Sequence, residues 1–172
     1  ETLRTIDEDG VNFRSHIDGS RRRFTPESVM RIQRNLGADV IMQFDHVIPG
    51  QSDATASRDA SERSIRWLAR CAAAAREEGG AGPEAKQALF PIVQGGIHET
   101  LRREAVDAIQ SLGDWQGFGI GGLSVGEAKD DMYRILVVVD GALPRSRPRY
   151  LMAVGFPEDL VGGVRRDVDL YD

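Results

Sequence analysis

The chain has 172 residues, a hydrophobic fraction of 41% and a formal net charge of -5. These values suit one domain with a sizeable core, and the acidic balance argues against a dedicated nucleic-acid-binding module. No apolar run approaches the roughly 20 residues of a membrane span, and residues 1–10 lack a signal-peptide pattern, which predicts a cytoplasmic protein. The single cysteine, Cys71, lies among alanines in a predicted helix, so we expect a structural thiol, and no metal-binding cluster is evident.

Two groups of arginines run against this acidic balance. They are Arg21-Arg22-Arg23 and the alternating Arg145, Arg147 and Arg149. Either group can meet phosphates, but solvated surface is the usual state of such side chains, and we expect it for both.

The first predicted elements are a hairpin and a helix. Short strands at 11–14 and 23–24 flank Asp18-Gly19, a pair typical of tight turns. A helix is predicted to follow between Thr25, as N-cap, and Gly37. Its expected apolar face consists of Val29, Ile32 and Leu36.

From there strands and helices alternate. Strands are predicted at 40–44, 89–93, 118–120 and 150–154, with a fifth beginning at 168–171. Helices are predicted at 57–78, ended by the glycine-rich residues 79–83, then around 101–112, from about 127 and from 157. Apolar strands alternating with helices indicate a parallel sheet with helical crossovers.

Two architectures fit this alternation, an open doubly wound sheet and a (β/α)8 barrel. A complete barrel takes roughly 250 residues and eight strands, more than this chain provides. Because the chain reaches Asp172 without a helix to cover its last strand, we interpret it as a contiguous part of a barrel, of about five βα units, with strands missing on both sides. Residues 1–172 would then form part of a single TIM-barrel catalytic domain.

Polar residues and glycines follow the predicted strands directly. They are Asp45, Gln94, Gly121-Gly122, Gly155 and Asp172. In (β/α)8 enzymes the carboxyl ends of the strands carry the active site, so these residues would face one mouth. For any single residue, capping of the next helix is an equally local explanation.

The glycine-rich run at 117–127 has the same two interpretations. Glycines allow the backbone to lie against a flat or anionic ligand and to present its N–H groups. Tight packing at a strand-to-helix turn produces the same composition.

The chemistry of such a mouth suits a purine base attached to a sugar. Asp45 can accept the N1–H and amine of a guanine-like edge, while Gln94 and the Gly122 N–H donate to its carbonyl. Met152 can lie on the ring, although its spacing also fits ordinary core. Asp172 remains as a carboxylate able to attack a sugar carbon, as in retaining glycosyl transfer.

Several segments, in order along nearly the whole chain, resemble the signatures of the tRNA-guanine transglycosylase family. They are Phe13-Arg-Ser-His-Ile-Asp-Gly19, Met42-Gln-Phe-Asp45, Ile92-Val-Gln-Gly-Gly96, Gly121-Gly-Leu-Ser-Val-Gly-Glu127, Arg149-Tyr-Leu-Met152 and Asp169-Leu-Tyr-Asp172. The resemblance implies a (β/α)8 barrel with a zinc subdomain, which exchanges a guanine in tRNA for a 7-deazaguanine base through a covalent aspartate–ribose intermediate.

The resemblance also implies roles for individual residues. Asp45 would read the Watson–Crick edge, Gln94 and Gly122 would contact the base carbonyl, the Leu123 carbonyl would face the 7-substituent, Met152 would stack on the base, and Asp172 would be the nucleophile. The first strands and the proton-transfer aspartate would precede this chain, and the zinc ligands would follow it. Its partners would be tRNA, guanine and 7-deazaguanine bases, with a homodimer or heterodimer expected for the full-length protein.

The chain departs from the family pattern at four positions. Ala153 and Asp167 stand where family members commonly carry glycine. Val47 matches eukaryotic members, which take queuine, whereas Val125 fills space that those members leave open with a glycine. We give Val125 the greater weight because it changes volume, and expect the aminomethyl base to be preferred over queuine.

Two other functions stay open at this point. One is a non-catalytic partner subunit of the same family, and the other is a different barrel enzyme with a phosphate site at Gly121-Gly122. Because Asp45, Gln94 and Asp172 are all present, the sequence favours the base-exchange enzyme.

Overall fold

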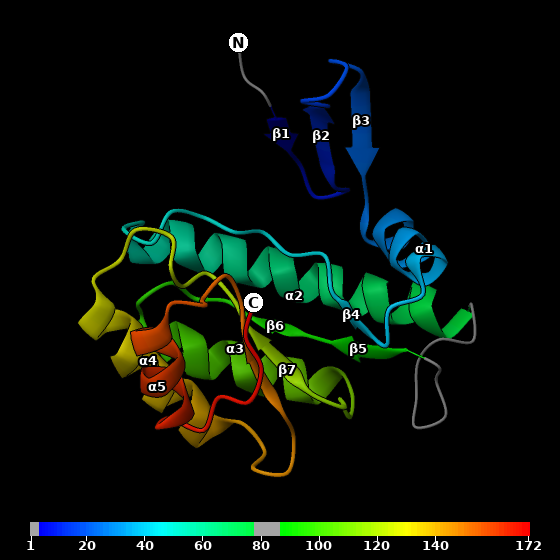
Figure 1. Cartoon of the computed structure of the whole chain (residues 1–172). Helices are drawn as coiled ribbons and strands as arrows, with labels where there is room; N and C mark the ends of the chain where they lie inside the picture. Colours follow the sequence, from blue (N-terminus) through cyan, green and yellow to red (C-terminus); the bar gives the residue numbers. More distant parts are fainter. Residues whose placement is uncertain (1–3, 78–86) are drawn as a thin grey trace.

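The computed structural model describes residues 4–77 and 87–172. Its amino-terminal part is an antiparallel sheet in which β2 (Val11–Arg14) lies between β1 (Arg4–Ile6) and β3 (Arg21–Phe24). The predicted hairpin between β2 and β3 is confirmed, and Gly19 provides its left-handed residue with φ 71°. Figure 1 shows this sheet set apart from the other strands.

Helix α1 (Pro26–Leu36) begins and ends where the sequence predicts. The Thr25 side chain accepts a hydrogen bond from the Ser28 N–H, the Ser28 hydroxyl accepts one from the Thr25 N–H, and Gly37 ends the helix at φ 75°. This reciprocal cap fixes the first turn, and the left-handed residue that closes the last turn carries no Cβ penalty because it is glycine.

The predicted apolar face of α1 is wrong at its carboxyl end. Leu36 is 78% exposed and Ile32 41%, whereas Met30 is buried. The helix is held to β4 by Gln33 instead, whose amide donates to the Met42 carbonyl at 2.7 Å and accepts from the Met42 N–H at 2.9 Å. Near this end of the helix, the polar Gln33 therefore makes the inward contacts that the apolar spacing predicted for Leu36.

The remaining strands form parallel ladders between neighbours in chain order. β4 (Val40–Met42) pairs with β5 (Ala88–Phe90), and β6 (Ile92–Val93) pairs with β7 (Phe118–Ile120), which pairs with β8 (Arg149–Leu151). The parallel sheet predicted from the alternation is confirmed.

These strands are shorter than predicted. The segment 89–93 is divided at Pro91, which has no N–H to donate to a ladder. The strands expected at 40–44 and 150–154 end at Met42 and Leu151. The strand expected at 168–171 is only a single parallel bridge between Tyr150 and Leu170.

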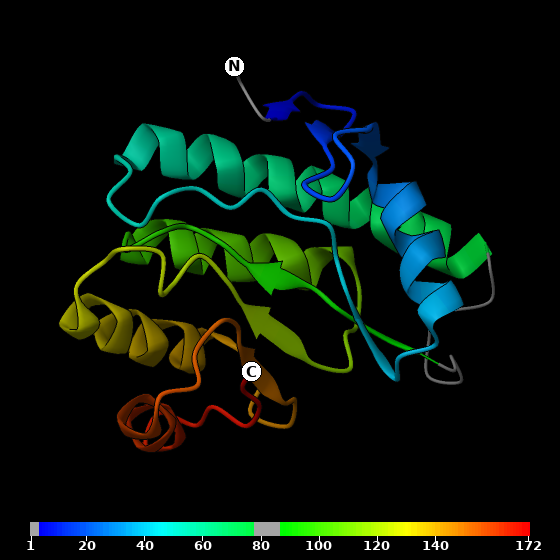
Figure 2. The same cartoon turned by 45° about the horizontal axis from the view of Figure 1, so that its top comes forward.

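Four helices follow the strands, namely α2 (Ala54–Glu77), α3 (Glu99–Leu112), α4 (Lys129–Ala142) and α5 (Pro157–Val164). Each contacts the next, and Figure 2 shows them succeeding one another along one side of the strands. α2 begins at Ala54 rather than at residue 57 because Asp53 caps it, accepting the Ala56 N–H at 2.8 Å. Its predicted last residue, Glu78, and the break at 79–83 lie outside the described residues. None of the helices in the described ranges is long and apolar enough to cross a membrane.

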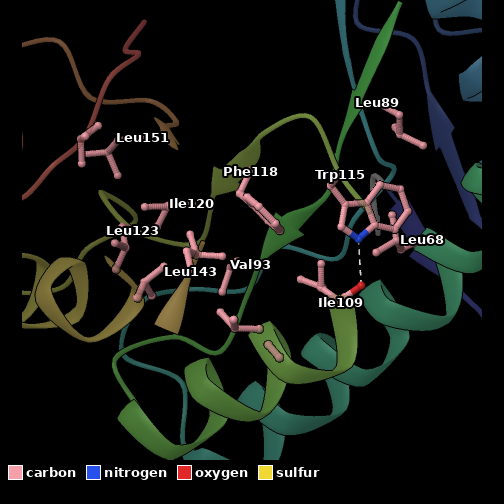
Figure 3. Packing of buried hydrophobic residues seen from close by; sticks show 14 of the residues in the cluster. Leu68, Leu89, Val93, Ile109, Trp115, Phe118, Ile120, Leu123, Leu143 and Leu151 are labelled. Atoms are coloured by element: carbon pink, nitrogen blue, oxygen red, sulfur yellow. Dashed lines mark hydrogen bonds between the residues drawn. The ribbon is translucent and has the colours of Figure 1, made fainter. Parts of the chain in front are cut away.

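The core lies between the strands and these helices. Figure 3 shows part of it, including Val93, Phe118 and Leu151 from neighbouring strands and the hydrogen bond from the Trp115 indole to the Ile109 carbonyl, 2.8 Å long. The first glycine of the run at 117–127 belongs to this packing, since a Cβ at Gly117 would overlap the ring of Phe90.

Two single residues test expectations about surface and core. Cys71 is buried, as predicted, and burial raises the pKa of its thiol to about 12. The expectation that Arg149 is solvated is wrong, because this side chain is only 4% exposed. Its guanidinium lies 2.8 Å from the Asp140 carboxylate and donates to the Arg147 carbonyl at 2.9 Å, which secures the loop before β8.

Candidate active site

A carboxylate and a carboxamide meet beyond the ends of β4 and β6. The Gln94 Nε2 donates to Asp45 Oδ2 at 2.6 Å, although the two residues are far apart in the sequence. Gln94 is buried and Asp45 is half-buried. Burial raises the pKa of Asp45 to about 6, while the Gln94 hydrogen bond acts in the opposite direction. The structure therefore brings together two of the residues that the sequence placed at one mouth.

The segment that carries Asp45 is anchored on α2. The Phe44 ring stacks on Trp67 with centroids 4.8 Å apart, and the His46 N–H donates to the Ser64 hydroxyl at 2.9 Å. Burial lowers the pKa of His46, and the charges of neighbouring arginines lower it further. Val47 is 38% exposed at the outer end of this segment.

The glycines after β7 are required by the position of Gln94. A Cβ at Gly121 would lie 2.8 Å from Gln94 Nε2, and one at Gly122 would overlap Gln94 Oε1. Gly122 also adopts φ 63°, a conformation that other residues rarely take. The carboxamide therefore lies directly against this turn, and close approach explains both glycines.

A buried arginine that the sequence analysis missed lies behind the turn. Arg102, in the first turn of α3, donates from Nε to the Gly96 carbonyl at 2.9 Å and from Nη1 to the carbonyls of Val93 and Gly121 at 2.7 and 2.8 Å. Its Nη2 donates to the Gly122 carbonyl at 3.3 Å. Burial lowers the pKa of Arg102 to about 9.

A signal for Arg102 was present in the sequence. It precedes Ala105, Val106 and Ile109, which are all buried, by three, four and seven positions. An arginine on the apolar face of a helix must have buried acceptors, and the ends of the neighbouring strands provide them.

The side chain of Glu127 stabilises the loop after β7 by accepting hydrogen bonds from its backbone. This carboxylate accepts from the Val125 N–H at 2.9 Å and also from the Ser124 N–H. Because a trans peptide directs its C=O and N–H in opposite directions, the Leu123 carbonyl points away from Glu127. Val125 is half-buried in this loop, and its carbonyl accepts from the Gly50 N–H at 3.1 Å, which joins the loops after β4 and β7.

A second carboxylate is held at the end of β8. The Tyr150 hydroxyl donates to Asp172 Oδ1, and the Ala153 N–H donates to Oδ2. Burial raises the pKa of Tyr150 to about 12, and the Asp172 hydrogen bond adds to this shift, so the hydroxyl keeps its proton. The side chain of Asp172 is exposed. Sequence analysis predicted a strand at 168–171 after the strand that contains Tyr150, but it missed Tyr150 because the alternation of strands does not show which side chain of β8 reaches Asp172.

Met152 directly follows β8. It is half-buried, and its sulfur would lie 3.5 Å from a Cβ on Gly119 of β7. Both interpretations of Met152, as core and as a surface for a flat ligand, are compatible with this place at the ends of the strands.

The two residues that stand where family members commonly carry glycine adopt the backbone conformation that glycine favours. Ala153 has φ 61° and Asp167 has φ 59°. Aspartate is among the residues that tolerate this conformation, and alanine is not.

Comparison with known proteins identifies the family. The family model described as queuine tRNA-ribosyltransferase matches residues 1–172. The queuine tRNA-ribosyltransferase of Herpetosiphon aurantiacus is 54% identical, over 97% of this chain and 41% of its own length. The enzyme of the same name from Symbiobacterium thermophilum is 51% identical, over 99% of this chain and 41% of its own length. That from Caldanaerobacter subterraneus subsp. tengcongensis is 48% identical, over 99% of this chain and 44% of its own length.

The chain thus spans about two fifths of the length of the curated relatives it matches. The match extends over every residue of the chain, including both groups of residues at the strand ends, and the resemblance of its motifs is confirmed. The chain belongs to the queuine tRNA-ribosyltransferase family.

Proposed function

We propose that the full-length protein exchanges a guanine base in the tRNA anticodon for a 7-deazaguanine base, and that this chain supplies the base pocket and the nucleophile. The observation that carries the proposal is the contact of Asp45 with Gln94 against the glycine turn at Gly122. These groups combine a carboxylate acceptor, amide donors and a backbone approach close enough for a flat ligand.

The donors and acceptors of this group match the edge of guanine. Asp45 accepts the base N1–H and its exocyclic amine. A carboxamide has two N–H donors, so Gln94 can keep its hydrogen bond to Asp45 and still donate to the base carbonyl. The Gly122 N–H is the second donor to that carbonyl. The Leu123 carbonyl faces the 7-substituent, and Met152 covers the ring.

The environment of Asp45 favours such a ligand. Its carboxylate is partly desolvated and has Gln94 as its side-chain donor. A base that brings two further donors removes much of the cost of keeping this charge away from water. Xanthine, which has a carbonyl in place of the amine, would present an acceptor to the same oxygen and is excluded.

Asp172 performs the displacement. One of its oxygens attacks C1′ of the ribose, the glycosidic bond breaks, and its electron pair leaves with guanine. The incoming base then attacks C1′ and releases the carboxylate, so that the configuration is retained after two displacements. Tyr150 and the Ala153 N–H hold the carboxylate in place for the attack. A proton-transfer aspartate of the full-length protein, outside this chain, handles the proton on the base.

We further propose that the chain is part of a (β/α)8 barrel within one catalytic domain. Parallel strands that neighbour each other in chain order, with each helix contacting the next, support this architecture. The same proposal gives the full-length protein tRNA as its partner, a homodimeric or heterodimeric state, and a place in the cytoplasm.

Zinc does not fit the residues of this chain that the structure describes. They include no group of three or more His, Cys, Asp or Glu side chains placed to hold a metal. Cys71 is buried, and the pKa of its thiol is raised, which opposes the thiolate form that metals bind. The zinc subdomain of the family, if the full-length protein has it, takes its ligands from elsewhere, and none of the steps above depends on it.

The proposal is tested with full-length protein, tRNA and labelled guanine. Incorporation of guanine, together with a protein–tRNA adduct that survives denaturing electrophoresis, is the expected result. Binding of tRNA without incorporation or adduct would identify the protein as a non-catalytic subunit. Failure to bind tRNA or guanine would refute the proposal altogether.

Base preference is set by Val125 in this proposal. A Val side chain in the loop after β7 fills space that the ring of queuine needs, and an overpacked pocket typically costs about 1–3 kcal/mol, roughly ten- to a hundredfold in affinity. We expect the aminomethyl base to be preferred, and Val125→Gly to improve queuine relative to it. Val47→Cys, at the more exposed position, is the matched comparison and should change the ratio less. A wild type that prefers queuine, or a ratio unmoved by Val125→Gly, would place selectivity at another residue.

A further inference from the structure

The guanidinium of Arg102 is fully buried, and the hydrogen bonds that it donates within the described part of the chain go to backbone carbonyls. The acceptors are Val93 and Gly96, at the end of β6 and in the loop after it, and Gly121 and Gly122, in the turn after β7. Burying a cation is costly, and here carbonyl dipoles accept its hydrogen bonds while the negative charge of Glu127 also favours the charged form. Such an arrangement does more than fill space, because it fixes the direction of each peptide it contacts.

The direction of one peptide matters for the base pocket. The Gly121 carbonyl points to Arg102 Nη1 at 2.8 Å. In the described residues there are no cis peptide bonds, so the N–H of the same peptide, which belongs to Gly122, points the opposite way. That direction leads away from the buried guanidinium. Gln94 lies against the same turn, since a Cβ on Gly122 would overlap its Oε1.

The turn has no side chains of its own to hold it in this orientation. Gly121 and Gly122 have no side chains, and glycine rotates between backbone conformations with little cost. Arg102 contacts the carbonyls on both sides of the Gly122 α-carbon, at 2.8 and 3.3 Å. Together with the Gly121 N–H, which donates to the Val93 carbonyl at 3.2 Å, these bonds define the turn.

The charge of Arg102 adds a second effect. A cation on a carbonyl oxygen draws electron density through the peptide and makes its N–H a stronger donor, as in other chains of hydrogen bonds. The Gly122 N–H becomes a stronger donor in this way, because the carbonyl of the same peptide, that of Gly121, accepts a hydrogen bond directly from the guanidinium.

We propose that Arg102 is a positioning residue for base recognition, which directs the Gly122 N–H into the pocket and strengthens it as a donor to the base carbonyl. This inference rests on the proposed function of the same pocket. It adds a residue that touches no substrate and acts through the glycine turn.

The test compares two bases that differ at this carbonyl. Guanine and 6-thioguanine share the N1–H and the amine that Asp45 accepts, but sulfur is a weaker hydrogen-bond acceptor than oxygen. Binding of each base to the full-length protein is measured by calorimetry for wild type and Arg102→Lys. Lysine keeps the charge but lacks the planar fork that reaches several carbonyls at once.

We expect Arg102→Lys to weaken guanine about tenfold and 6-thioguanine less than about threefold, since the lost interaction is one hydrogen bond to the carbonyl. Arg103→Lys, the same change on the exposed neighbour in α3, is the control and should alter neither base. A variant that weakens both bases by the same factor, or neither, overturns the inference and leaves Arg102 a purely structural residue.

Folding is checked by the melting temperature of each variant. If Arg102→Lys does not fold, Arg102→Gln, which keeps a neutral donor at the same place, is measured with the same pair of bases. Failure of both variants to fold would also count against a specific role in recognition. A wild type that binds neither base would instead refute the proposed function, so the two failures are distinguishable.

Discussion

The two carboxylates at the strand ends are held in opposite ways. Asp45 is half-buried, receives one side-chain hydrogen bond from Gln94, and has a pKa raised to about 6. At Asp172, donors from Tyr150 and Ala153 occupy both carboxylate oxygens. A desolvated carboxylate with few donors is suited to select a ligand that brings donors, whereas one whose direction is fixed by two donors is suited to attack. In our proposal, the different surroundings of these two aspartates give them different roles.

The largest expected effect is the loss of adduct formation when Asp172 is replaced. Asp172→Asn in the full-length protein should abolish the covalent tRNA adduct, with a loss of about a thousandfold or more, because the amide is a poor nucleophile. Guanine binding, measured by calorimetry, should change little. Asp167→Asn, a neighbouring exposed position where asparagine tolerates the left-handed backbone, is the control. An adduct of normal yield in Asp172→Asn would show that another group attacks the sugar.

Asp45→Asn should weaken the binding of guanine, which Asp172→Asn leaves nearly unchanged. The amide loses one acceptor and presents its N–H₂ to the donors of the base, so we expect guanine affinity to fall about a hundredfold. Calorimetry with full-length protein measures this loss, and Asp107→Asn on the exposed face of α3 is the matched control. If Asp45→Asn instead bound guanine normally and lost only the adduct, the roles of the two carboxylates would have to be exchanged.

The raised pKa of Asp45 predicts a pH dependence with a definite sign. Between its unfolded value of 3.8 and its folded value of about 6, the folded protein binds more protons at this residue, so its contribution to stability falls as pH rises through this window. Asp45→Asn should therefore be more stable than wild type at pH 7, by about 1–3 kcal/mol, and lose this advantage near pH 4. Urea unfolding of both proteins at the two pH values tests it. A difference that does not change with pH would mean that Asp45 is well solvated.

The smallest effect concerns the backbone that holds Asp172. Ala153 has φ 61°, and an L-residue pays about 1–2 kcal/mol for this conformation. Ala153→Gly removes that strain while making the unfolded chain more flexible, so we expect a net gain of about 0.5–1 kcal/mol in urea unfolding. The N–H to Asp172 is retained, and adduct formation should be unchanged. Ala73→Gly, on the exposed face of α2, should instead lose about 1 kcal/mol.

The parts of the fold that local chemistry determines could be predicted from the sequence. Thr25, Pro26 and Gly37 specify the ends of α1 because capping involves only nearby backbone. Apolar segments likewise indicated the alternation of strands and helices. Strand lengths could not be predicted in this way, since a ladder depends on a partner far along the chain, as the single bridge at Leu170 illustrates.

The residues of the candidate site likewise fall into those that the local sequence indicates and those that depend on distant parts of the chain. Asp45, Gln94 and Gly122 could be singled out because each directly follows an apolar strand. The supporting residues are less evident. The helical spacing of Arg102 indicates burial but not which carbonyls it binds, and the partner of Tyr150 lies about twenty residues later in the chain. Arg149 was misjudged because its carboxylate partner, Asp140, lies in α4, and the alternating arginines after that helix do not show which of them turns back toward it.

Trp67 gives the pocket an optical reporter within the protein itself. Its ring stacks on Phe44, directly before Asp45, and its indole N–H donates to the Glu8 carbonyl at 2.7 Å. Trp115, the other tryptophan, lies in the core near the beginning of β7 and is bonded to Ile109. With Trp115 replaced by phenylalanine, the fluorescence of Trp67 would follow the docking of the amino-terminal sheet and the seating of a base beside Asp45 in real time, without any attached dye.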